Sequence, residues 1–201
     1  MSASQFDPRR PPALQGEHTV LEPISQTEIL PLLLAHAGDS DLMELRCGLG
    51  DKPTQALIQR HVAAGDICLW SVASRHPDPN KLQAPPAAWA VYSRVSTLHY
   101  IGVFTPLQGE LRGAPLDEAA HAEVLECLCE AIFSGTEAEQ VVSHVAIPCS
   151  EELYALYMRL GWEQWSTEWL LRAPPRFIFA LPRSVYALYH EEPQDELAED
   201  F

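Results

Sequence analysis

The sequence predicts a single mixed α/β (α+β) domain, with a mostly antiparallel sheet of about seven strands flanked by about four helices. Three observations predict this fold class. The 201 residues are 47% hydrophobic, which is enough apolar material for one core and one domain. Three successive strand segments in the first half of the chain are separated by a loop and by a tight turn, which is typical of an antiparallel meander. Further along, a helical segment separates two strand segments, and that order requires a right-handed parallel crossover.

Strand segments are predicted where bulky and β-branched residues lie between turn residues. They cover residues 18–24, 66–73, 87–94, 97–105, 140–147, 162–171 and 177–181. The strands at 97–105 and 140–147 flank a helix, so we expect them to be parallel neighbours in the sheet. Open sheets of this kind bind ligands where neighbouring strands diverge, and we expect these two strands to part toward their C-terminal ends.

Four helices are predicted from apolar residues spaced three and four apart. The first carries Ile29, Leu32, Leu33 and His36 on one face, and it either begins at about Thr27 or is kinked at Pro31. The other three cover residues 52–64, with Asp51 as N-cap and Gly65 as stop, residues 117–133, ended by Gly135, and the segment from Ser150, ended by Gly161.

Composition limits the function classes. The formal net charge of −15 disfavours nucleic acid and anionic membranes as partners and favours cationic small molecules. No apolar run approaches the roughly 20 residues that span a bilayer, and the polar, proline-rich N-terminus is unlike a signal peptide, so we expect a cytoplasmic protein. Residues 1–17 are predicted to be a flexible lead-in, residues 18–189 the domain, and residues 190–201 a disordered acidic tail.

The five cysteines are scattered without CxxC spacing, which argues against a disulfide framework or a zinc site. The eight histidines show no metal-ligand spacing either. No metal is therefore expected.

The most distinctive segment is the predicted helix that begins at Ser150, with the sequence S-E-E-L-Y-A-L-Y-M-R-L-G-W-E. Leu153, Leu156, Tyr157 and Leu160 fall at i, i+3, i+4 and i+7, the spacing of one apolar helix face. Within it, L-Y-M-R-L-G-W at residues 156–162 resembles the Leu-Tyr-x-Lys-x-Gly-Phe segment near the C-terminus of GNAT superfamily N-acetyltransferases, which use acetyl-coenzyme A.

The resemblance implies a GNAT-like fold in which this helix packs beside the pantetheine arm of coenzyme A. It also implies that Tyr157 protonates the departing coenzyme A thiolate as a general acid. An aromatic at helical spacing beside three leucines is also typical of a core residue, and both interpretations of Tyr157 stay open at this point.

Members of this family hold the coenzyme A pyrophosphate on backbone N–H groups of a Gln/Arg-x-x-Gly-x-Gly/Ala loop before a helix. In the matching position, Gln108 and Gly113 fit the ends of the pattern, but Leu111 stands where a glycine belongs. Asp117 and Glu118 would repel a pyrophosphate at the helix start. The resemblance implies cofactor contacts from Val103, Thr105, Gln108, Gly109, Arg112 and Gly113. The alternative is an ordinary surface loop.

Histidines supply the candidate bases. His99 and Tyr100 are adjacent on one strand and point to opposite faces, so only one of them can face a cleft. The ordinary pKa of His99 suits it to deprotonating an ammonium substrate. His144 on the neighbouring strand is a rival, and Cys149 with His144 is a thiol-hydrolase alternative.

The function predicted from these residues is an acetyl-CoA-dependent N-acyltransferase that acts on a primary amine of a small molecule or a peptide. The alternative is a catalytically inactive GNAT-fold module with a binding or regulatory role, which the departures in the loop favour. The sequence does not identify the acceptor, and a homodimer is an open possibility.

Overall fold

The computed structural model describes residues 6–75, 88–105, 116–168 and 175–190. An eight-stranded sheet in the order β1-β2-β3-β4-β5-β6-β8-β7 forms its centre. The strands are β1 (Leu14–Gln15), β2 (Thr19–Pro23), β3 (Ile67–Ser74), β4 (Ala88–Ser93), β5 (His99–Phe104), β6 (Gln140–Ala146), β7 (Glu163–Glu168) and β8 (Arg176–Pro182). Every neighbouring pair is antiparallel except β5 and β6, which are parallel. The predicted mixed, mostly antiparallel sheet is confirmed.

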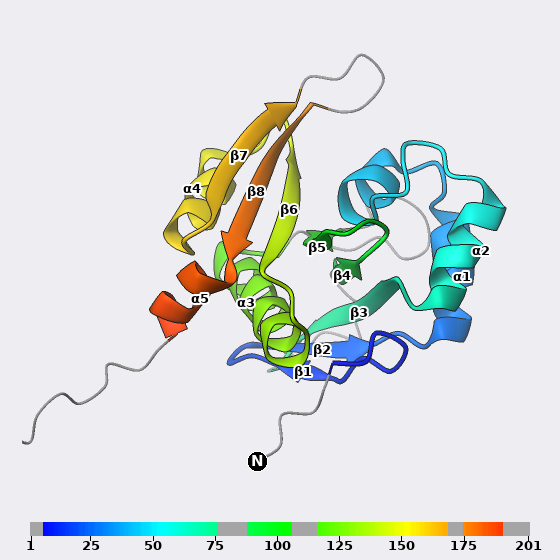
Figure 1. Cartoon of the computed structure of the whole chain (residues 1–201), viewed down its shortest axis with the longest axis horizontal. Coiled ribbons are helices and arrows are strands. Elements are labelled where there is room, and N and C mark those ends of the chain that lie inside the picture. The colour runs from blue at the N-terminus through cyan, green and yellow to red at the C-terminus, as the bar shows by residue number, and fades with distance from the viewer. Residues whose placement is uncertain (1–5, 76–87, 106–115, 169–174, 191–201) are drawn as a thin grey trace, which may run out of the picture.

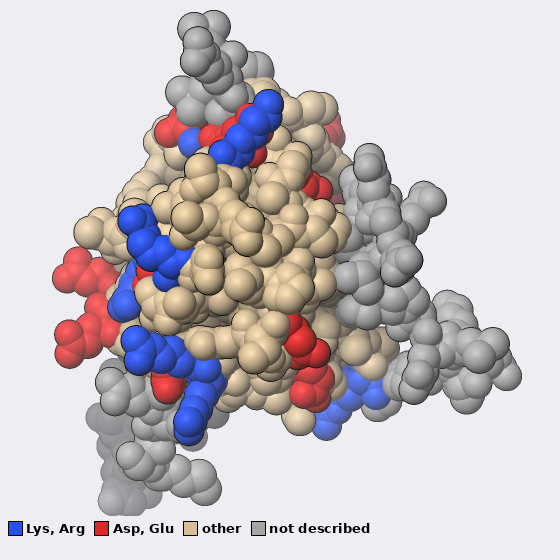
Figure 2. Space-filling model, turned by 90° about the vertical axis from the view of Figure 1, so that its right-hand side faces the viewer, with Lys and Arg blue, Asp and Glu red and all other residues tan. Residues whose placement is uncertain are grey.

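The helices are α1 (Gln26–Ala35), the π-helix η1 (Asp41–Arg46), α2 (Gln55–Ala64), α3 (Glu118–Gly135), α4 (Glu151–Arg159) and α5 (Arg183–His190). Figure 1 shows α1, α2 and η1 on one side of the sheet and α3 on the other, with β6, β8 and β7 turned away from the first five strands. The face that carries α1 and α2 shows few charged side chains at its centre, and charges gather toward its rim (Figure 2).

Two hydrophobic clusters lie on opposite faces of the sheet. Successive side chains of β4 point to opposite faces, so this strand contributes to both clusters. Tyr92 belongs to the cluster under α3, whereas Trp89 and Val91 belong to the cluster under α1, α2 and η1. A strand buried on both faces has an apolar run without polar alternation, as residues 88–92 have. The two layers of helices therefore follow from the sequence of the strands between them.

Several helix boundaries follow local sequence as expected. The Ser150 hydroxyl accepts a hydrogen bond from the Leu153 N–H at the start of α4, and Asp117 does the same for Ala120 in α3. Gly65 after α2 and Gly161 after α4 have φ of 77° and 80°, the left-handed conformation that ends helices. The N-cap of α2 is Thr54 rather than the predicted Asp51, so that helix begins three residues later than expected.

The sheet has eight strands where about seven were predicted, because the short β1 adds to its edge. One expectation was wrong. Residues 6–15 are part of the domain and not a flexible lead-in, since Phe6 is only 6% exposed and its N–H donates to the Gly135 carbonyl. The helices η1 and α5 were not predicted at all. The predicted acidic tail from residue 191 onward lies outside the described ranges.

Candidate active-site cleft

The strands β5 and β6 pair over only two positions, His99 with Val141 and Tyr100 with Val142. Beyond them β5 continues along β4, whereas β6 continues along β8. The two strands therefore diverge toward their C-terminal ends, as the order of elements predicted. The gap between β5 and β6 is visible in Figure 1.

A cavity of about 400 Å³ lies at this divergence, and we call it the β5/β6 cleft. Four segments line it: β5 with its exit (Val103, Thr105), the start of α3 (Leu116, Glu118, His121), the start of α4 (Ser150, Glu152, Leu153, Leu156) and η1 (Asp41, Arg46). Its walls thus come from segments that are up to about a hundred residues apart in sequence. Leu153 and Leu156 reach it because they share one face of α4.

Arg46 lies across the divergence. Its Nη1 donates to the His144 carbonyl on β6 at 2.6 Å, and its Nη2 donates to Asp41 Oδ1 at 3.2 Å. On β5, a Cβ at Gly102 would lie 3.0 Å from Arg46 Cδ, so the glycine leaves room for the arginine. The Arg46 side chain is 11% exposed, and its Nε has no hydrogen-bond partner among the described residues. The guanidinium therefore reaches the cleft through the gap between the two strands.

His121 supplies an uncharged imidazole. Burial, reinforced by the nearby positive charge of Arg46, lowers the pKa of His121 to about 4. Its Nε2 is buried and has no hydrogen-bond partner within the described part of the chain. At neutral pH this side chain is therefore a neutral lining group of the cleft.

Carboxylates surround the helix starts at the cleft. The Asp117 side chain is engaged as the cap of α3, and Glu118 forms an ion pair with Arg159 of α4. Glu152 lies in the first turn of α4, where the helix dipole favours a negative charge. The ion pair offsets part of the repulsion that these side chains would exert on an anionic ligand.

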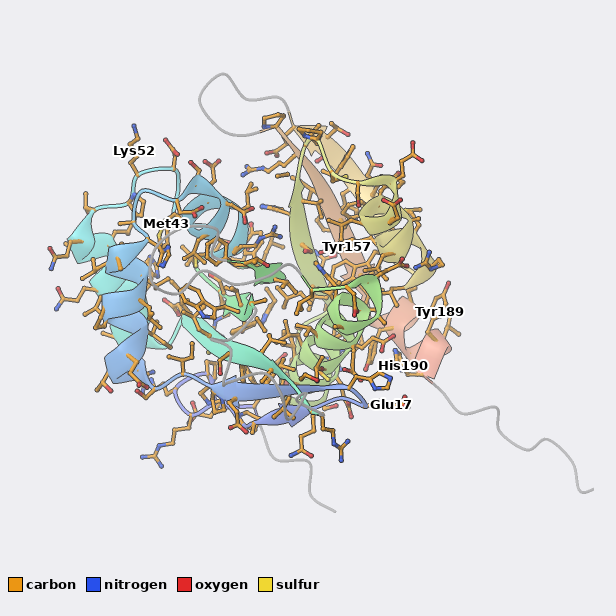
Figure 3. The ribbon with its side chains drawn as sticks, turned by 180° about the vertical axis from the view of Figure 1, so that it is seen from behind. Glu17, Met43, Lys52, Tyr157, Tyr189 and His190 are labelled. Carbon is orange, nitrogen blue, oxygen red and sulfur yellow. The ribbon has the colours of Figure 1, made fainter. Side chains whose placement is uncertain are left out.

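Tyr157 does not line the cleft. It is 1% exposed, stacks on Phe179 with ring centroids 4.7 Å apart, and shares a hydrogen bond of 2.8 Å with the Ser143 hydroxyl on β6. Burial raises the pKa of Tyr157, which stabilises the protonated phenol. The expectation that its hydroxyl lies at the cleft was wrong, because the buried Ser143 hydroxyl holds it inside the core. Tyr157 is labelled in Figure 3. Tyr154 is the more exposed of the two, as predicted.

Replacing Tyr157 by phenylalanine is expected to lower the free energy of unfolding by about 1–2 kcal/mol, because the Ser143 hydroxyl is left buried without its partner. Ser143→Ala is expected to cost a similar amount. The double variant should cost less than the sum of the two, since both polar groups are then gone. Urea unfolding of the four proteins measures this coupling, and additive losses would contradict the hydrogen bond.

His99 is not in the cleft either. It lies at the paired end of β5, where its Nδ1 is 3.0 Å from the Tyr92 hydroxyl. Burial and the charge of Arg94 lower the pKa of His99. The proposed base of the sequence analysis is thus part of a hydrogen-bonded pair at the opposite end of the strand from the divergence.

The thiol alternative finds no support in the geometry. Burial raises the pKa of Cys149, whereas a nucleophilic thiolate needs a lowered one. His144 is 6% exposed, and burial together with the charges of Arg176 and Arg46 lowers its pKa to about 3. Its ring packs edge-on against Tyr100, 5.1 Å between centroids.

Of the predicted cofactor contacts, Val103 and Thr105 line the cleft, and Gln108, Gly109, Arg112 and Gly113 lie outside the described residues, as does Leu111. Asp41, Arg46 and His121 were not among the site residues predicted from the sequence. A signal existed for His121, which precedes Val124 and Leu125 by three and four residues and so shares the inward face of α3. No comparable signal exists for Arg46, because the six residues of η1 are too few to show a repeating pattern of apolar residues.

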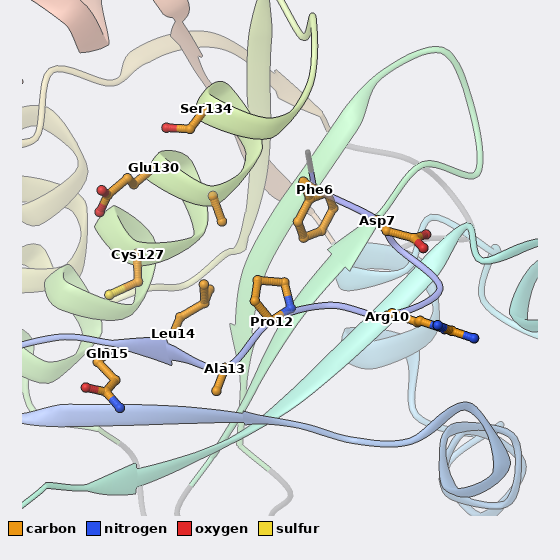
Figure 4. Close-up of a pocket in the computed structure, with 11 residues that line it drawn as sticks. Phe6, Asp7, Arg10, Pro12, Ala13, Leu14, Gln15, Cys127, Glu130 and Ser134 are labelled. Carbon is orange, nitrogen blue, oxygen red and sulfur yellow. The ribbon is translucent and has the colours of Figure 1, made fainter. Parts of the chain in front are cut away.

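A second cavity, of about 300 Å³, lies between the N-terminal segment and α3 (Figure 4). Phe6, Leu14 and Cys127 are among its lining residues, and it shares none with the β5/β6 cleft. Within the described ranges, no cluster of three or more histidine, cysteine or acidic side chains is arranged to hold a metal ion. No helix in those ranges is long and apolar enough to cross a membrane.

Sequence comparisons find no matching protein-family model and no matching curated protein. Solved structures do match. A probable GNAT-family acetyltransferase from Chromobacterium violaceum is 17% identical, with 92% of each chain covered and a TM-score of 0.53. A spermidine/spermine N-acetyltransferase from Vibrio cholerae is 12% identical, with 88% of this chain and 100% of that chain covered and a TM-score of 0.56. A GCN5-related N-acetyltransferase from Brucella melitensis is 13% identical, with coverages of 97% and 92% and a TM-score of 0.52. At these identities the likeness concerns the fold.

Proposed function

From the GNAT fold of this chain, we propose that it transfers an acyl group from acyl-coenzyme A, with acetyl-CoA as the expected donor, to a primary amine in the β5/β6 cleft. The observation that carries the proposal is the position of the cleft. It lies at the divergence of the parallel pair, between the end of β5 and the helix that bears the Leu-Tyr-x-Arg-x-Gly-Trp segment. Apolar side chains of Val103, Leu153 and Leu156 line it, and these suit the uncharged pantetheine arm.

Acyl-coenzyme A supplies the acyl group, which its thioester bond activates for transfer. The pantetheine arm would lie along the end of β5, beside Val103 and Thr105, in the position that an additional strand of the sheet would take. The backbone of β5 beyond Tyr100 makes no ladder contact with β6, so among the described strands this edge of β5 is unpaired at the cleft. His121, whose pKa burial lowers to about 4, is a neutral polar group among the lining side chains.

The second candidate is a GNAT-fold module that binds a ligand without catalysis. Tyr157 favours it, because the residue that the family resemblance assigns to thiolate protonation is bonded to Ser143 inside the core. The two candidates differ in a measurable way. The enzyme binds acetyl-CoA and releases free thiol in the presence of an amine, whereas the module releases none.

Acetyl-CoA is expected to raise the melting temperature of the wild-type protein, and Leu153→Trp is expected to weaken its binding by about tenfold or more. The larger indole would occupy part of a cavity of about 400 Å³ from a position that is only partly buried, so the variant should still fold. Calorimetry measures the affinity. Leu188→Trp is the matched control, because Leu188 is 75% exposed on α5 and does not line the cleft.

A panel of small-molecule and peptide amines, with thiol release as the readout, then separates the candidates. Binding with thiol release supports the acyltransferase. Binding without release from any amine supports the module. The cleft assignment would be wrong if acetyl-CoA bound equally well to the wild type and to Leu153→Trp.

A further inference from the structure

Arg46 is the only permanently cationic side chain among the described residues that line the β5/β6 cleft. Arg46 belongs to η1, and two contacts hold η1 against β6 and β8. Arg46 itself bonds to the His144 carbonyl, and Glu44 forms a 3.0 Å ion pair with Arg176 of β8. Both Glu44 and Arg176 side chains are 12% exposed, so this anchor is nearly as buried as Arg46. π-Helical turns are rare in proteins, and those that occur are often found at functional sites.

Acyl transfer from a thioester to an amine places negative charge first on the carbonyl oxygen and then on the departing sulfur. The cleft must stabilise that charge, and in a site shielded from water a fixed positive group does so more effectively than in bulk solvent. Tyr157 does not reach the cleft, because its hydroxyl is bonded to Ser143. His121 carries no charge at neutral pH.

Resting on the proposed acyl transfer, we propose that Arg46 is a catalytic residue of this cleft, whose guanidinium stabilises the carbonyl oxygen and the thiolate of the reacting thioester. The amine nitrogen bonds to the carbonyl carbon, the carbon–sulfur bond breaks, and the sulfur leaves with its electron pair. The amine loses one proton and the thiolate gains one, so the products are an amide and free coenzyme A. Arg46 transfers no proton, since its guanidinium stays charged throughout.

The surroundings of Arg46 fit this role. Two of its N–H groups are used, one by the His144 carbonyl and one by Asp41, and a guanidinium has further N–H donors to offer. The two bonds fix its plane before any ligand arrives, which lowers the cost of reorganisation during the reaction. Gly102 admits the side chain to the gap, where a larger residue on β5 would displace it.

The test uses acetyl-CoA labelled with ¹³C at the thioester carbonyl and infrared difference spectroscopy of the bound state. We expect the carbonyl stretch to shift to lower frequency in the wild type, to return toward its free value in Arg46→Gln, and to stay shifted in part in Arg46→Lys. With a reactive amine, kcat of Arg46→Gln should fall by about 10²-fold or more, while the affinity for free coenzyme A changes far less. A purely structural role would not move the carbonyl frequency.

Arg176→Gln is the matched control, because it removes an equally buried arginine beside η1 that does not line the cleft. It should lower the melting temperature and leave the carbonyl frequency shifted. Equal carbonyl frequencies in the wild type and Arg46→Gln would overturn the role of Arg46 and leave the acyl transfer standing. Failure of the wild type to bind acetyl-CoA would overturn both proposals. Should Arg46→Gln not fold, an unshifted carbonyl in Arg46→Lys would overturn the role of Arg46.

Discussion

The free energy of unfolding is expected to fall by about 5 kcal/mol when the pH is lowered from about 7 to about 4.5, because two buried histidines stay uncharged in the folded state. The pKa of His144 is lowered to about 3 and that of His121 to about 4, in both cases mainly by burial. Both side chains also have one buried ring nitrogen without a partner in the described part of the chain.

The sign follows from proton binding. Well above pH 6.5, the ordinary pKa of histidine, both side chains are neutral in the folded and unfolded states and contribute no pH dependence. As the pH falls below 6.5, the unfolded chain binds protons and the folded chain does not, so unfolding becomes easier. The loss continues until the pH reaches the folded pKa, about 4 for His121 and about 3 for His144.

His144→Phe isolates one of the two contributions. It keeps a ring beside Tyr100 and removes the titration, so the loss between the two pH values should shrink by about 2–3 kcal/mol. Urea unfolding at each pH gives the difference, and any uniform cost of the substitution cancels within each variant. His18→Gln, at a side chain that is 65% exposed, is the control and should leave the loss unchanged. An identical loss in His144→Phe and the wild type would contradict the buried neutral state.

Phe6→Ala is expected to lower the free energy of unfolding by about 3–5 kcal/mol, the usual cost of truncating a buried aromatic. The Phe6 ring packs 5.3 Å from Tyr92 and 6.4 Å from Trp70, between centroids, although it lies near the start of the chain (Figure 4). The chain that follows Phe6 is also hydrogen-bonded to β3, because the Trp70 indole N–H donates to the Pro12 carbonyl at 2.8 Å.

Arg10→Ala is the control for Phe6→Ala, since Arg10 is an exposed residue of the same segment. It should change the free energy of unfolding by less than about 0.5 kcal/mol. Denaturant unfolding at neutral pH measures both variants. If both were neutral, the N-terminal segment would behave as the flexible lead-in that its composition suggested.

Local sequence alone determined much of the fold. The apolar runs of β3 and β4, the caps Ser150 and Asp117 and the stops Gly65 and Gly161 act within a few residues, so a single sequence contains what is needed to predict them. The order of elements also determined the parallel pairing of β5 with β6, because a strand–helix–strand unit has essentially one hand. Those two steps placed the β5/β6 cleft, and the resemblance to GNAT N-acetyltransferases supplied two of its lining residues, Val103 and Thr105.

Tertiary structure decided which side chains enter the cleft. Tyr157 has the same helical spacing whether its hydroxyl meets a ligand or a core residue, and the presence of Ser143 on the neighbouring strand selected the core. Arg46 enters from η1 because Gly102 and the His144 carbonyl, both more than fifty residues away, make room for it and bind it. Phe6 is buried among side chains of α3, β3 and β4, which come together only in the folded chain. Periodicity records which face of an element is apolar, but the partner of that face is set by contacts between distant residues, and these form only in the folded chain.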